Sequence, residues 1–132
     1  MNLINANERE LLVFGVPYNK KAYELGGIRR FEDMTVGTAK ELLLKGYVDP
    51  CDAQNLSPTA QEMIDFCDDG SNKWYLHGYV VSPERDDCRI TFEGVGSHGT
   101  LNSKEALDFM AYFRYADDIS VDIGGTAYCW YD

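Results

Sequence analysis

The chain has 132 residues, 45% of them hydrophobic, which is enough apolar surface for one globular domain and excludes an intrinsically disordered chain. Its 22 acidic and 12 basic residues give a formal net charge of −10 at pH 7. Residues 1–49 hold seven acids and seven bases, so the whole excess lies in residues 50–132, which hold fifteen acids and five bases. A field of one sign repels nucleic acid and attracts basic proteins.

The N-terminal portion, residues 1–72, is predicted to be helical. Asn7 is placed to cap a short helix from Glu8 to Phe14, which Gly15 would end. Residues 18–34 show no sustained period and are expected to form a loop or a short helix.

Two clearer helices follow in this portion. Thr35 can cap a helix that runs to Leu44 and ends at Gly46, where the left-handed conformation favours glycine. Ser57 as N-cap, with Pro58 at the first helical position, predicts a helix that runs to Asp69 and is ended by Gly70.

The segment from Thr35 to Pro50 resembles the helix and wing of winged-helix proteins. This resemblance implies a helical DNA-binding unit, whose reading helix and contact face are expected to be basic. The helix predicted at 57–69 instead carries Glu62, Asp65, Asp68 and Asp69 and no lysine or arginine. We therefore expect a degenerate winged-helix-like portion that contacts proteins rather than nucleic acid.

Residues 73–132 are predicted to fold as ββαββ. Strand-like runs at 74–81 and 88–95 form a hairpin, and Asn102 with Glu105 makes a capping-box start for an amphipathic helix through Tyr115. Alternation at 119–123, a two-residue turn at Gly124-Gly125 and a return at 126–131 complete the pattern. The predicted fold is α+β, with the helical portion packed against a four-stranded antiparallel sheet as one compact unit.

The hydrophobic pattern assigns the two faces of this sheet. If Val80 lies opposite Cys88 and Tyr128 opposite Val121, one face is apolar and accepts the amphipathic helix. The reverse face would then carry mixed aromatic and polar side chains, namely Tyr75, His77, Tyr79, Arg89, Thr91, Glu93, Ser120, Asp122, Cys129 and Tyr131. Such a face suits a partner-binding platform, although the interpretation that the N-terminal helices cover it is slightly better supported.

No motif in the chain specifies a catalytic or a metal site. His77 could act as a general base with Glu93 or Asp122, but a packed strand histidine is the commoner case. The spacing Gly94-x-Gly96-x-x-Gly99 matches a dinucleotide fingerprint but follows a hairpin strand instead of opening a parallel βαβ unit. We predict no cofactor.

The cysteines and the acid pairs point away from metals too. Cys51, Cys67, Cys88 and Cys129 lack the close spacing of zinc ligands, and free buried thiols are expected rather than disulfides. Acid pairs recur at element ends without an EF-hand pattern, so solvated turns are the simplest account. The candidate binding residues are Tyr75, His77, Tyr79, Glu93, Asp86, Asp87, Asp117, Asp118 and Asp122.

These observations favour a non-catalytic, acidic protein-interaction module that docks on a basic partner. Inhibitors of nucleic-acid enzymes, such as bacterial immunity proteins or phage anti-defence proteins, belong to this physical class. Two alternatives stay open: a small enzyme or ligand-binding protein with a pocket around His77, and an assembly subunit that self-associates. With no apolar run near the roughly 18 residues that span a bilayer and no signal-like start, we predict a cytoplasmic protein without membrane contact.

Overall fold

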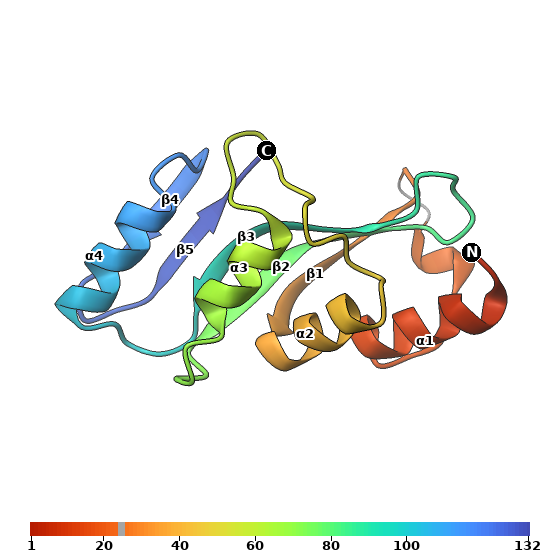
Figure 1. Cartoon of the computed structure of the whole chain (residues 1–132), viewed down its shortest axis with the longest axis horizontal. Coiled ribbons are helices and arrows are strands. Elements are labelled where there is room, and N and C mark those ends of the chain that lie inside the picture. Colours follow the sequence, from red (N-terminus) through yellow and green to blue (C-terminus); the bar gives the residue numbers. More distant parts are fainter. Residues whose placement is uncertain (24–25) are drawn as a thin grey trace.

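A computed structural model describes residues 1–23 and 26–132 of the chain. Its architecture is α+β, and the described strands form one antiparallel five-stranded sheet in the order β1-β2-β3-β5-β4 (Figure 1). The elements in chain order are α1 (Leu3–Phe14), the 3₁₀-helix η1 (Lys20–Tyr23), β1 (Ile28–Thr35), α2 (Val36–Leu44), α3 (Ala60–Cys67), β2 (Trp74–Val81), β3 (Ile90–Ser97), α4 (Ser103–Tyr112), β4 (Asp118–Val121) and β5 (Ala127–Trp130). The predicted fold class is confirmed.

Strand β1 lies where the sequence predicted a loop or short helix, so the sheet has five strands and not four. It pairs antiparallel with β2. The sheet therefore includes a strand from the portion 1–72, which was predicted to be helical, as well as strands from the portion 73–132. Of the remaining residues of the predicted loop, 20–23 form η1, whereas 24 and 25 lie outside the described part.

The helix caps differ from prediction at two of three N-terminal positions. Helix α1 begins earlier, because the Asn2 side chain accepts a hydrogen bond from the Asn5 N–H. Helix α2 begins after Thr35 as predicted. Helix α3 begins after Thr59, which forms a reciprocal capping box with Glu62.

The β4–β5 hairpin is shifted by one residue from the predicted register. Ser120 pairs with Tyr128 and Val121 pairs with Ala127, since the connection is longer than two residues: the Asp122 N–H bonds the Thr126 carbonyl. A shift of one residue exchanges the two faces of a strand. Cys129 and Tyr131, predicted on the reverse face, are therefore buried in the core. Tyr128 and Trp130 take their place on the reverse face.

The β2–β3 hairpin is shifted by two residues, with Val80 opposite Ile90, so its predicted faces are kept. The side chains of Leu76, Val80, Ile90 and Phe92 enter the core. All four cysteines are free; Cys67 and Cys129 are buried as expected, but Cys51 is exposed.

The helices pack on one face of the sheet. Figure 1 shows α2, α3 and α4 on the same side of it, with α1 beside α2. The buried residues of these helices join the core side chains of the strands in one cluster, for example Ala39 and Leu42 from α2, Ile64 from α3 and Phe109 from α4. The opposite face of the sheet is left free of helices in the part of the chain that the structure describes.

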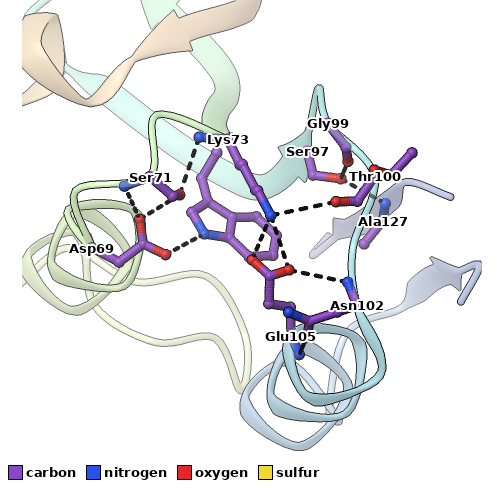
Figure 2. A network of polar contacts seen from close by, with 10 residues as sticks. Asp69, Ser71, Lys73, Ser97, Gly99, Thr100, Asn102, Glu105 and Ala127 are labelled. Carbon is purple, nitrogen blue, oxygen red and sulfur yellow. Dashed lines mark hydrogen bonds and ion pairs between the residues drawn. The ribbon is translucent and has the colours of Figure 1, made fainter. Parts of the chain in front are cut away.

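A polar network ties the loop before β2 to the start of α4 (Figure 2). The Asp69 carboxylate accepts a hydrogen bond from the Trp74 indole N–H at 2.9 Å. The Lys73 ammonium donates to both oxygens of Glu105, and Glu105 in turn accepts from the Asn102 N–H. The Asn102 bond, followed by the Lys73 ammonium, holds the pKa of Glu105 below its usual range. This network fixes the position of α4 against the sheet.

Among residues 1–23 and 26–132, no helix has both the length and the apolar composition needed to cross a membrane.

Candidate functional site

The open face of the sheet, which no helix covers, carries aromatic rings from two strands. Tyr75 and Tyr79 of β2 and Trp130 of β5 are half-buried, Tyr128 of β5 is 37% exposed, and His77 of β2 is buried between them. On β3, Thr91 pairs with Tyr79 and therefore lies on the same face of the sheet. We call this surface the open face.

The interpretation that the N-terminal helices cover this face is wrong. Helix α2 contributes Ala39 and Leu42 to the core on the other side. Helix α1 also packs on that other side, where the ring of Phe14 lies 3.8 Å from the guanidinium of Arg29, the β1 residue paired with Val80. The buried helix residues of the apolar cluster all lie on one side of the sheet. The helices therefore bury these apolar side chains without using the open face.

Two glycines of β3 shape the centre of the open face. A Cβ atom built on Gly96 would lie 2.2 Å from the Tyr75 hydroxyl oxygen, and one built on Gly94 would lie 2.5 Å from Nε2 of His77. The side chains of Tyr75 and His77 therefore lie flat across β3, which only glycine permits there. The glycine spacing that matched a dinucleotide fingerprint serves this close packing within an antiparallel sheet.

The neighbours of His77 on both sides are irregular. In β1 the register shifts between Phe31 and Met34, and in β3 it shifts so that His77 pairs with Gly94 whereas Gly78 pairs with Phe92. The extra residue in β3 is Glu93. Bulges of this kind redirect side chains and are common beside binding sites.

His77 is held in one orientation by two contacts. Its Nε2 lies 2.7 Å from the Cys129 carbonyl oxygen, across β3, and its ring stacks on Tyr128 with centroids 4.7 Å apart and an interplanar angle of 12°. Burial lowers the pKa of His77 below 6.5, against the raising effect of the Cys129 carbonyl. The neutral ring must therefore carry its proton on Nε2, and no residue of the described ranges bonds to Nδ1.

Glu93 joins three strands by contacting Arg30 and Trp130, two residues that line a cavity on the open face. It is buried, and its carboxylate pairs with the guanidinium of Arg30 from β1 and accepts from the Trp130 indole N–H of β5 at 3.2 Å. The cavity has a volume of about 330 Å³ and is lined by Arg30, Phe31, Glu32, Tyr75, His77, Gly78, Tyr128 and Trp130. Its walls are aromatic and its polar groups include both a cation and a carboxylate, which suits recognition of a polar side chain.

The lowered pKa of His77 predicts a dependence of stability on pH. Between the folded pKa and 6.5, the unfolded chain binds more protons at this histidine than the folded chain does, so the free energy of unfolding falls with the pH. The contribution of the buried, neutral His77 to stability is therefore present above pH 6.5 and is lost as the pH falls through the folded pKa. The difference in free energy of unfolding between pH 7.5 and pH 5, measured by urea denaturation, should shrink in His77→Gln. The exposed His98→Gln is the control, and an equal pH dependence in wild type and His77→Gln would contradict this assignment.

The acids of the candidate set do not converge. Asp86 and Asp87 lie in the β2–β3 connection, where Asp87 is paired with Arg85 and Arg89. Asp117, Asp118 and Asp122 lie around β4, at the other end of the sheet (Figure 1). Of the predicted residues, Tyr75, His77, Tyr79 and Glu93 come together on the open face. Within the described ranges no three His, Cys, Asp or Glu side chains form a group that could hold a metal ion.

Three residues of the open face were not predicted from the sequence. Tyr128 and Trp130 were assigned to the apolar face because of the one-residue shift in β5. Arg30 was missed with its strand. The signal that was present is the adjacent pair Gly124-Gly125, which marks a turn but leaves its length open.

Comparisons with protein-family models, with curated proteins and with solved structures found no match to this chain.

Proposed function

We propose that the protein is a non-catalytic binding module that docks on a basic partner protein through the open face of its sheet. The observation that carries the proposal is the one-sided packing of the helices, which leaves the rings of Tyr75, Tyr79, Tyr128 and Trp130 uncovered on a five-stranded sheet. A two-layer domain of this size needs only one face of its sheet for its own core.

The composition of the open face supports a protein partner. Tyrosine, tryptophan and arginine are the residues most often found to dominate binding energy at protein interfaces. Here Arg30 and Arg89 are held by Glu93 and by Tyr79, so their side chains are already oriented before a partner arrives. Preorganised groups bind at a lower entropic cost.

The net charge of −10 supports a partner of opposite sign. A one-signed field raises the rate of encounter with a basic protein, and the effect weakens as salt shortens the screening length. Long-range attraction therefore comes from the acidic excess of residues 50–132, and short-range contact from the open face. An inhibitor of a basic enzyme, such as an immunity or anti-defence protein, would use this combination.

Affinity capture from source-cell lysate tests the proposal. The wild type should retain one basic protein at low salt and release it at high salt. Trp130→Ala and Tyr128→Ala should each reduce the retained amount by roughly tenfold or more, as expected for central aromatic contacts. Leu44→Ala, which changes a side chain that is 87% exposed on α2, is the matched control and should retain the partner.

Equal retention by all three variants would overturn the open-face assignment. If no protein is retained even by the wild type, a ligand-binding function takes precedence. That second candidate is favoured by one observation, the cavity beside His77, whose Nδ1 is free to accept a hydrogen bond among the described residues.

A further inference from the structure

We propose that the outer edge of β4 is a docking site for an extended, basic segment of the partner, which adds to the sheet as a further antiparallel or parallel strand. The inference rests on the proposed function, since it takes the basic character of the partner from it. It adds a second contact surface and a binding mode, in which main-chain hydrogen bonds supply affinity and alternate side chains supply selectivity.

The two edges of the sheet are protected to different degrees. Strand β1, at one edge, is interrupted by a bulge between Phe31 and Met34. The two residues between them, Glu32 and Asp33, are both charged. Bulges and edge charges are the usual means by which proteins prevent unwanted strand pairing. Strand β4, at the other edge, pairs without a register shift and presents the uncharged sequence Ile119-Ser120-Val121.

The main-chain groups of Ile119 and Val121 point outward from this edge. On β5 the Tyr131 N–H bonds the Glu93 carbonyl of β3, so the odd-numbered residues of β5 face β3 and the even-numbered ones face β4. The paired residues of β4 that bond to β5 are therefore Asp118 and Ser120. No other backbone bond within the described residues involves Ile119 or Val121, so a strand laid along β4 would find their donors and acceptors unpaired.

Apolar side chains continue beyond β4 on the helical side. Met110 is 47% exposed and Ile119 is 38% exposed, and with Arg114 and Val121 they line a cavity of about 400 Å³ between α4 and β4. Every second side chain of an added strand would enter this space. The alternate side chains would lie on the other side of the sheet, beside Asp118 and Ser120.

Charge selects the occupant of this edge. Asp117, Asp118 and Asp122 flank the uncharged stretch, and all three side chains are exposed. Two copies of this chain pairing antiparallel through β4 would bring these acids against one another, which opposes dimer formation. A segment that alternates apolar and basic residues would instead place its bases beside the acids, so a basic segment is the occupant that fits.

Two synthetic probes test the site directly: an eight-residue peptide of alternating valine and lysine, and its counterpart with glutamate in place of lysine. Amide hydrogen exchange of the ¹⁵N-labelled protein is followed by NMR with millimolar peptide. The lysine peptide should slow exchange of the Ile119 and Val121 amides by roughly fivefold or more, whereas the glutamate peptide should leave both unchanged. Added salt should weaken the protection.

Two variants complete the test. Ile119→Pro removes an outward N–H without touching the bonds between β4 and β5, and proline is tolerated at such edge positions, so protection of Val121 should be lost. Asp118→Asn keeps the strand and should reduce the affinity for the lysine peptide severalfold. No protection by the lysine peptide, equal protection by both peptides, or protection that rises with protein concentration alone would each overturn the proposal. If it fails while partner capture still depends on Trp130, the proposed function stands and only the edge site is lost.

Discussion

Glu10→Gln is expected to lower the free energy of unfolding by about 3–5 kcal/mol, because it leaves a buried arginine without its counter-charge. Arg9 and Glu10 of α1 are both 0% exposed, and Nε of Arg9 lies 3.5 Å from Oε2 of Glu10. A second guanidinium nitrogen donates to the Val81 carbonyl at 3.0 Å, so the pair joins α1 to the end of β2. Tyr23 donates its hydroxyl proton to Glu10, and burial, with the Glu10 bond added, raises the pKa of Tyr23.

Urea denaturation at pH 7 measures this effect, and an exposed carboxylate of the same helix supplies the control. Glu8 lies 3.6 Å from Lys45 with half of its side chain in solvent, so Glu8→Gln should change the free energy of unfolding by about 1 kcal/mol or less. The double variant Arg9→Met with Glu10→Met should recover a large part of the loss, since it removes both buried charges. A loss in Glu10→Gln no larger than that in Glu8→Gln would contradict the account of this pair.

Gly94→Ala is expected to lower the free energy of unfolding by about 3 kcal/mol, the upper end for overpacking by one methyl group. The added Cβ would lie 2.0 Å from the carbonyl oxygen of Cys129, a backbone atom that cannot move aside cheaply. The same methyl group would displace His77 from its hydrogen bond to that oxygen. In the variant the proton of the neutral imidazole should therefore no longer be fixed on Nε2. The ring nitrogen resonances of His77, measured by NMR, report this change.

Gly99→Ala is the matched control for this substitution. Its Cβ would make only an ordinary contact, with the nearest atom of Lys73 at 3.6 Å, so its effect on stability should stay within about 0.5 kcal/mol. Equal effects of the two substitutions would mean that the close packing of His77 over β3 is not what requires glycine at position 94.

The parts of the fold that the sequence predicted are those with an unbroken period. Alternation through 74–81 placed Tyr75, His77 and Tyr79 on one face of β2, and the spacing of Ala106 and Phe109 marked the buried side of α4. Strand β1 escaped because its core residues, Phe31 and Met34, are three apart across the bulge, which removes the period of two.

The composition of the open face was predicted only in part, because a single turn decides half of it. The register of β5 depends on how many of residues 122–126 form the turn, and a sequence can mark a turn without fixing its length. A two-residue turn would have sent Tyr128 and Trp130 into the core. The longer connection sends them to the open face, where Tyr128 stacks on His77 and Trp130 bonds Glu93.

Photocrosslinking from the open face in source-cell lysate tests the central claim most directly. A p-benzoylphenylalanine replaces Tyr128, which is 37% exposed on β5, or Leu44, which is 87% exposed on α2. The account predicts that the probe at 128 links the chain to one basic protein at low salt and less at high salt, while the probe at 44 does not. A basic protein linked only from position 44, or equally from both positions, would contradict it.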